Sequence, residues 1–360
     1  MAVTSYGTNN ALAVKLWSKR LSVEALKATW LFKFVGDTTD DLIQIKDETQ
    51  KSAGDAITYG LRMQLSGVGV LGDGTLEGNE EALTTYSDQL IINQLRHAVR
   101  SQGRMSQQRV PFSVRDEALS GLRDWWADRI DYSGFNQLCG NLGPSLPGLS
   151  GVDTRYTGLN SPIAPDANHY TNAVASADDT GLSSGNVFTL TMIDKAIERA
   201  KTLTPAIRPI KQNGKQVYVA WLHPYQVTDL RTSTSTGQWL DIQKAAMTGG
   251  EIGDNPIFDG SLGMYNGVLL HEDARVTQGY NPSTAAAITT VRRAVFGGAQ
   301  AGMIGFGRDN SINKFTWVEE LFDYENQLGV SAGLIFGLKK TTFNSSDFAT
   351  VVMSSYATSH

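Results

Sequence analysis

The longest amphipathic helix predicted by the sequence covers residues 113–138, and any fold of this chain has to bury its apolar side. Apolar residues recur there at steps of three and four, which places them on one broad helical face. Ser113 followed by Asp116 has the form of a capping box, and Pro111 keeps the helix from starting earlier. The expected core residues on this face are Leu119, Leu122, Trp126 and Ile130.

The clearest strand pattern lies at residues 57–65, where apolar residues alternate with polar residues or glycine. A glycine-rich stretch at 66–80 follows, and a second run at 81–93 alternates roughly. Strand, tip and returning strand predict a long β-hairpin. A two-stranded hairpin is marginal by itself in water, so this one needs a partner surface, for which another subunit is the nearest candidate.

The other segments predict a mixed fold. Residues 1–46 are either two short helices packed on the body or an extended arm on a neighbouring subunit. Residues 140–187 are rich in Gly, Pro, Ser, Asn and Asp and read as a long loop. A helix is expected at 191–203, and strands alternate with helices from 206 to 300. Residues 315–353 are again rich in strand signals.

Composition restricts the possible partners. The 360-residue chain has a net charge of −5 and no Lys/Arg cluster longer than a dipeptide, which disfavours nucleic-acid binding through a basic patch. Cys139 is the one cysteine, so neither an intrachain disulfide nor a thiolate metal site is expected. No apolar run of about 18 residues suggests a membrane span, and the first residues do not resemble a signal peptide.

One motif hints at an enzyme. Residues 67–72 match G-x-G-x-x-G after a strand, but a dinucleotide site also needs a helix that begins at this turn. Asp73-Gly74 and Gly78 follow at once and disfavour that helix, so a hairpin tip is the better interpretation. His223 precedes Pro224 at a strand-to-helix corner, where a capping role is expected. We therefore predict no catalytic, cofactor-binding or metal-binding residues.

Several stretches, taken in order, resemble the Hong Kong 97 (HK97)-type major capsid proteins of tailed phages, and within them the family typified by coliphage N-four. Residues 90–109 resemble the link from an extended loop, the E-loop, into a spine helix. Residues 217–230, VYVAWLHPYQVTDL, resemble a strand–His-Pro–helix segment, and 267–272 resemble a later strand. Residues 337–351 resemble a closing G-x-K-K…F…D-F-G-V pattern, in which Ala349 replaces the expected glycine.

The resemblance implies an α+β, HK97-type fold. Its parts would be an N-terminal arm, an E-loop hairpin with its link, a P-domain with the spine helix and the long loop, an A-domain, and closing P-domain strands. In this sequence the parts correspond to residues 1–46, 47–100, 101–205, 206–300 and 301–360.

The resemblance also implies a structural function. Copies would assemble as hexamers and pentamers of an icosahedral or prolate phage head that encloses double-stranded DNA without binding it specifically. The protein would be made in the host cytoplasm and end in the virion, without a membrane, catalysis or a cofactor. Its partners would be other copies of itself and decoration, portal and scaffolding proteins. The expected intersubunit contacts are Tyr59, Leu61, Arg62, Met63, Glu77, Glu80 and Glu81.

Two alternatives stay open at the level of sequence. An encapsulin-like compartment shell would share the fold but enclose a cargo enzyme instead of DNA. A nucleotide-binding enzyme would use the glycine loop at 67–72, and would lose its cofactor on replacement of Gly69 by valine.

Overall fold

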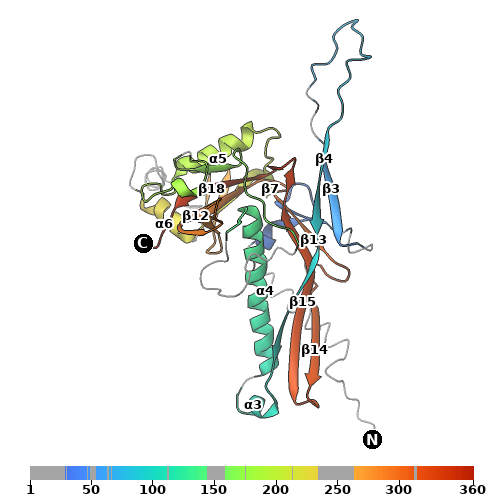
Figure 1. The fold of residues 1–360 in the computed structure, drawn as a ribbon, viewed down its shortest axis with the longest axis vertical. Helices are drawn as coiled ribbons and strands as arrows, with labels where there is room; N and C mark the ends of the chain where they lie inside the picture. The colour runs from blue at the N-terminus through green and yellow to red at the C-terminus, as the bar shows by residue number, and fades with distance from the viewer. Residues whose placement is uncertain are drawn as a thin grey trace.

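The computed structural model describes residues 29–360 except for 144–158, 234–262 and short gaps at 30, 47, 49–53, 63–64, 66, 112, 175, 213 and 312–313. The molecule is tall (Figure 1). A column formed by helix α4 and strands β14 and β15 stands below a wider lobe that carries α5, α6, β12 and β18. The hairpin β3–β4 rises beside the lobe, at the upper right of the view, and ends in a long projecting loop.

The helices are few and the strands many. The helical segments are η1 Leu31–Phe34, α3 Arg104–Gln108, α4 Val114–Leu138, η2 Asp179–Gly181, α5 Leu190–Thr202 and α6 Pro224–Thr232. The strands are β1 Val35–Gly36, β2 Ile43–Lys46, β3 Ala56–Arg62, β4 Thr85–Ile91, β5 Asn93–Arg100, β6 Tyr170–Asn172, β7 Ile210–Gln212, β8 Lys215–Leu222, β9 Met264–Tyr265, β10 Val268–Glu272, β11 Gln278–Tyr280, β12 Ala287–Gly297, β13 Gly302–Phe306, β14 Thr316–Phe322, β15 Gln327–Lys340, β16 Thr342–Phe343, β17 Ser346–Asp347 and β18 Thr350–Tyr356.

Helix α4 is the predicted long helix, and the structure confirms it. The Ser113 side chain accepts a hydrogen bond from the Asp116 backbone N–H, and the first turn carries Asp116 and Glu117, whose charges suit the positive end of the helix dipole. The helix ends at Leu138, and Gly140 follows with a φ of +61°, a conformation that glycine adopts without strain.

The apolar face of α4 covers a six-stranded sheet. Its strand order is β1-β2-β13-β15-β14, and β5 also pairs with β15. The Trp126 ring centroid lies 5.0 Å from that of Phe315 and 6.3 Å from that of Phe336 on β15. The four residues expected in the helix core are buried, with exposed fractions of 0–3%: Leu119, Leu122, Trp126 and Ile130.

The wider lobe is built on an eight-stranded sheet of order β6-β18-β12-β8-β10-β9, to which β11 and β7 add. Strand β18 pairs with β12 from Val291 to Gly297 and with β6, and α5 packs on β18 and β6. Residues 301–360, which were expected to form closing P-domain strands, therefore contribute to both sheets: β13, β14 and β15 join the six-stranded sheet and β18 joins the eight-stranded sheet. The last strand crosses to the second sheet and ties the two layers together, which the local pattern of residues 315–353 does not reveal.

Strand β8 runs into α6 through the predicted His223-Pro224 corner, and the capping role is confirmed. The His223 Nδ1 accepts from the Tyr225 N–H at 3.2 Å, and the Gln226 side chain accepts from the His223 N–H at 3.0 Å. Burial, helped by the Arg292 charge, lowers the pKa of His223 to about 4. At neutral pH the imidazole is thus uncharged and can accept the capping hydrogen bond.

This cap predicts a loss of stability in acid. The unfolded chain takes up a proton at His223 near pH 6.5, whereas the folded chain resists it down to about 4. Stability from this group is therefore complete above pH 6.5 and falls by about 2 kcal/mol at pH 5. Urea unfolding at pH 7 and pH 5 measures this. The variant His223→Asn keeps a capping side chain without a titration, and should lose this part of the pH dependence. An unchanged pH dependence in that variant would contradict the assignment.

The remaining predictions differ in detail or lie elsewhere. The helix expected at 191–203 is α5, whose N-cap is Thr189. The spacing of Thr191 and Asp194 also has the form of a capping box, but both residues lie inside the helix. The Asp194 carboxylate instead accepts from the Tyr265 hydroxyl and the Asn266 amide. Most of the 1–46 arm lies outside the described residues, as do residues 234–262 of the segment in which strands and helices were expected to alternate.

Candidate subunit interface

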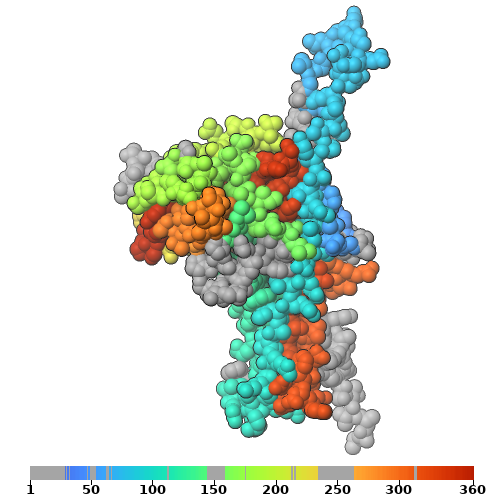
Figure 2. Space-filling model, in the orientation of Figure 1, coloured from blue at the N-terminus to red at the C-terminus, as the bar shows by residue number. Residues whose placement is uncertain are grey.

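The tip of the β3–β4 hairpin, residues 65–84, projects away from the rest of the chain (Figure 2). Strands β3 and β4 pair antiparallel from Ala56–Ile91 to Arg62–Thr85, so the predicted hairpin is confirmed. Beyond Arg62–Thr85, the tip carries large apolar side chains that no part of its own described chain covers well. Their exposed fractions are Leu65 58%, Val68 96%, Leu71 87%, Leu76 61% and Leu83 57%.

The tip is also uniformly acidic. Residues 63–84 contain four carboxylates, Asp73, Glu77, Glu80 and Glu81, and no Lys or Arg. The Gly67 N–H donates to Glu81 at 2.6 Å and the Gly78 N–H donates to Glu80 at 2.7 Å. Two of the four carboxylates thus brace the loop itself. All four side chains are exposed, so the tip offers an apolar surface within a field of negative charge.

The G-x-G-x-x-G stretch, residues 67–72, lies in this tip. Its described residues form turns and extended chain, and no helix begins there, so the arrangement that a dinucleotide phosphate needs is missing. No group of three or more His, Cys, Asp or Glu side chains suited to a metal ion occurs among the described residues. In the same part of the chain, no helix is long and apolar enough to cross a membrane.

The root of the hairpin is fixed to its own subunit. Tyr59 is only 8% exposed, because its ring packs edge-on against Phe343 at 6.0 Å and its hydroxyl donates to Asp88 at 2.9 Å. Burial, with the Asp88 charge, raises the pKa of Tyr59. Tyr59 is therefore an anchor within its own chain, and the predicted contact of Tyr59 with a neighbouring subunit stays a prediction.

The other predicted contact residues are distributed along the hairpin. Leu61 is half-buried at the root, and Arg62 ends strand β3. Met63 lies outside the described residues. Glu77, Glu80 and Glu81 lie together in the exposed tip. Among the described residues, the predicted set thus divides into a root, which its own chain holds, and an exposed tip.

Two further connections fix the root. The Lys339 ammonium on β15 pairs with the Asp88 carboxylate on β4, where both side chains are largely buried. Asn160 accepts from the Ile91 N–H at 2.9 Å and donates to the Ile91 carbonyl oxygen at 2.7 Å, and so acts as an added strand partner. Gly337 allows close approach here, because an added Cβ would lie 2.2 Å from the Ile91 oxygen.

Two buried ion pairs join the elements behind this root. Arg293 on β12 donates from Nε to Asp179 at 2.7 Å, and the guanidinium lies 4.1 Å from the Tyr280 ring centroid. Lys340 pairs with Asp347 at 2.6 Å, with both side chains 1% exposed. The sequence analysis did not predict these four charged residues. Their partners are distant in sequence, and a single charged residue without a nearby partner is ordinarily assigned to the solvent-exposed surface.

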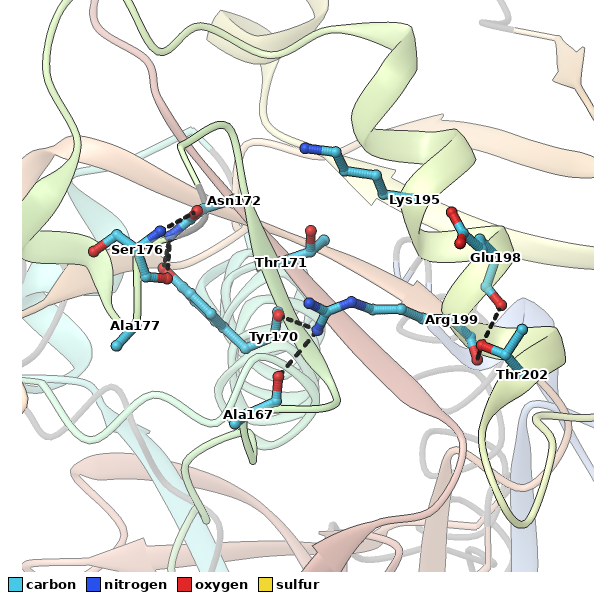
Figure 3. Close-up of a pocket in the computed structure, with 10 residues that line it drawn as sticks. All are labelled: Ala167, Tyr170, Thr171, Asn172, Ser176, Ala177, Lys195, Glu198, Arg199 and Thr202. Atoms are coloured by element: carbon cyan, nitrogen blue, oxygen red, sulfur yellow. Dashed lines mark hydrogen bonds between the residues drawn. The ribbon is translucent and has the colours of Figure 1, made fainter.

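A surface recess of about 460 Å³ lies between α5 and the loop that leads into β6 (Figure 3). The Arg199 guanidinium donates to the backbone carbonyl oxygens of Ala167, Asn168 and Tyr170. The Asn172 amide accepts from the Ser176 N–H and donates to the Ser176 oxygen. These bonds hold the loop on α5, so the recess is a structural joint between helix and loop.

A protein-family model described as phage capsid protein matches residues 5–359. The chain belongs to the phage capsid protein family. It is 28% identical over 358 residues to the major capsid protein of Pseudomonas phage KPP25, which covers 92% of this chain and 89% of that protein.

Solved capsids share the architecture of this capsid protein. It is similar to the capsid of Ralstonia phage GP4, with 31% identity, a TM-score of 0.77 and coverage of 99% of both chains. The capsid of cyanophage Pam1 is 17% identical with a TM-score of 0.71, covers 100% of this chain and 97% of that chain, and shows the shared fold. The α+β fold is thus the HK97-type capsid fold, and the protein is a structural, shell-forming subunit of a phage virion, as predicted.

Proposed function

We propose that copies of this chain form hexamers and pentamers of a closed phage head around double-stranded DNA, and that each hairpin tip clamps a neighbouring copy. The observation that carries this proposal is the combination of a fixed root and an exposed tip with five large apolar side chains. Exposed apolar area of this kind marks interaction surfaces. One weak contact per subunit is enough, because the symmetry of a shell repeats it many times.

The surface that suits the tip is the face of the six-stranded sheet turned away from α4. Register places Arg96 and Arg100 of β5 beside Gly333 and Gly329 of β15, on the side opposite to the buried Ala332. Both arginines are exposed and form no ion pair within the described residues. Two unpaired cations oppose the four carboxylates of the tip in sign.

Apolar groups on the same face complete the match. Val318 of β14 is 48% exposed, and it pairs in register with Ser331. The Phe322 ring lies over Gly329 and 4.3 Å from the Arg100 guanidinium carbon. Strand β15 lies between β5 and β14, and between the exposed groups of those two strands it carries only small side chains on this face. An extended loop can therefore lie flat across it. We therefore propose this face as the receptor for the acidic, apolar tip of another copy.

The wider proposal follows from these contacts. The head encloses DNA without a specific grip, which suits an acidic subunit with dispersed cations. The subunit is made in the cytoplasm of the host, carries out no catalysis, and meets portal, scaffolding and decoration proteins as the shell is built. DNA recovered from purified heads after nuclease treatment would distinguish this function from that of a compartment shell, which would hold a cargo protein.

A charge exchange tests the clamp. The double variant Asp73→Lys/Glu77→Lys places like charges opposite Arg96 and Arg100, so closed shells should fall by at least about ten-fold in yield. Arg96→Glu/Arg100→Glu alone should have a similar effect. Combining all four substitutions restores opposite charges, and shell yield by electron microscopy and light scattering should recover.

The results of the charge exchange distinguish a direct contact from a general loss of folding. Asp73 and Glu77 are exposed and leave the bracing carboxylates of Glu80 and Glu81 in place, so each variant should keep its folded body by circular dichroism. Recovery in the quadruple variant supports the contact directly. If both double variants assemble normally, or if the quadruple variant stays as defective as the doubles, then this face is not the receptor.

A further inference from the structure

The lower end of the column is a second exposed surface, at the far end of the molecule from the hairpin tip (Figure 1). It is formed by α3 and by the turn between β14 and β15, residues 323–326. Asn326 joins the two parts, because its side-chain oxygen accepts from the Arg104 N–H at 3.2 Å. The Gln327 amide also donates to the Gln102 carbonyl oxygen at 3.2 Å. The helix and the turn therefore form one surface, called the column end below.

The turn holds its residues in an unfavourable backbone conformation. Asp323, Tyr324 and Glu325 have φ angles of +52°, +50° and +68°. This left-handed conformation costs energy in residues with a side chain, and aspartate tolerates it better than tyrosine or glutamate does. The Asn326 N–H donates to the Asp323 carbonyl oxygen at 2.9 Å and helps to hold the turn. Three such residues in succession indicate that their side chains have a role at the surface.

Tyr324 gains no packing within its own chain in return for this cost. Its exposed fraction is 103%, the highest among the large apolar side chains of the described residues. Met105 of α3, at the same end of the column, is 64% exposed. A methionine side chain packs well on an aromatic ring, because its sulfur is polarisable and its chain is flexible. Each copy thus offers both a ring and a side chain that suits the ring of another copy.

The charges at the column end also favour another copy as the partner. The α3 side carries Arg104 and Arg109, whereas the turn carries Asp323 and Glu325, and all four are exposed. Arg104 and Glu325 lie 3.9 Å apart with side chains 72% and 71% exposed, so this pair contributes little within the chain and can exchange partners. An acidic turn beside a basic helix is complementary in charge to the same surface of a second copy.

A closed shell needs a contact of this kind. A hairpin tip that clamps the next copy repeats around one axis and so closes a ring. Rings join into a shell only through a second contact about a different axis. The column end and the hairpin tip lie at opposite ends of the long axis of the molecule (Figure 2), so the two surfaces can serve two separate contacts.

We propose that the column ends of subunits from neighbouring rings bind one another, with Tyr324 of one copy packed against Met105 of the next. The acidic turn then lies opposite Arg104 and Arg109 of that copy. The contact is head to tail, since each copy gives a ring to one neighbour and accepts a ring from another, and it closes about an axis. This proposal rests on the proposed shell, but not on the receptor face for the hairpin tip.

Replacement of Tyr324 tests the contact. Tyr324→Asn removes the ring and keeps a residue that tolerates a positive φ, so the turn should hold. Closed shells should fall at least about ten-fold in yield while ring-sized oligomers accumulate, because an aromatic anchor carries much of the affinity of a small contact. Electron microscopy and light scattering measure both species. The matched control Tyr324→Phe keeps the ring and should assemble normally.

Methionine variants test the other side of the contact. Met105→Ala should reproduce the defect of Tyr324→Asn, with rings but few closed shells. The control Met264→Ala changes a methionine of β9 in the lobe that is 51% exposed, and it should assemble normally.

A chemical cross-link identifies the two residues directly. Tyr324→Cys subunits and Met105→Cys subunits are mixed with wild-type subunits so that shells form, and the shells are treated with a short bismaleimide. Mass spectrometry should then find a peptide that links position 324 to position 105. Each chain carries only one of these cysteines, so such a link joins two copies. Cys139 is buried and does not compete.

The results separate this contact from the proposed function. If the wild-type chain forms no closed shell, the proposed shell and this contact both fail. If wild-type shells form but Tyr324→Asn assembles equally well, or if no link between positions 324 and 105 is found, then the column end does not join copies and only this contact is overturned.

Discussion

Replacing Trp126 with alanine is expected to destabilise the subunit by about 3–5 kcal/mol, the range for removal of a fully buried large aromatic side chain. Trp126 is 0% exposed and lies between Trp125, Phe315 and Phe336, which come from the helix, the strand-rich segment and β15. Its removal leaves a cavity at the centre of the column, where the sheet behind α4 cannot close it. Urea unfolding followed by far-UV circular dichroism measures the loss.

Two further variants show whether the lost side-chain volume at Trp126 causes the loss of stability. The Trp126 Nε1 has no hydrogen-bond partner among the described residues, so Trp126→Phe removes an unsatisfied donor together with part of the ring, and should cost less than about 1.5 kcal/mol. Trp125 is half-buried and stacks on His97 at 4.4 Å, so Trp125→Ala should cost clearly less than Trp126→Ala. Equal losses at the two positions would show that the column does not depend on the Trp126 packing.

The elements that the sequence predicted well are those with strong local signals. The 25-residue helix α4 repeats its apolar residues over seven turns and begins at Ser113. The His223-Pro224 corner combines a fixed proline φ with a capping side chain, and α6 begins there. In both cases the residues that decide the structure lie within a few positions of each other.

Pairings between distant segments were not predictable in this way. Strand β18 alternates little and is buried on both faces, so its pattern does not reveal which sheet it joins. Tyr59 fits the alternation of a hairpin strand, and only the distant Phe343 and Asp88 show that it is an anchor. The Lys340–Asp347 and Arg293–Asp179 pairs likewise depend on the fold that brings them together.

Removing residues 66–80 is expected to abolish closed shells while the subunit stays folded. The deletion takes away Val68, Leu71 and Leu76, which are more than 60% exposed and add little to the core of their own chain, whereas the root at Tyr59 and Asp88 remains.

The variant Val68→Ser/Leu71→Ser/Leu76→Ser keeps the loop length and should show the same defect, which excludes a simple effect of chain shortening. The control Leu159→Ser changes a side chain of similar exposure, 63%, outside the tip and should assemble normally. Electron microscopy and light scattering measure assembly, and circular dichroism measures folding. Normal shells from the deletion would show that the tip is not a clamp, because a contact repeated at every subunit cannot be lost without effect on the shell.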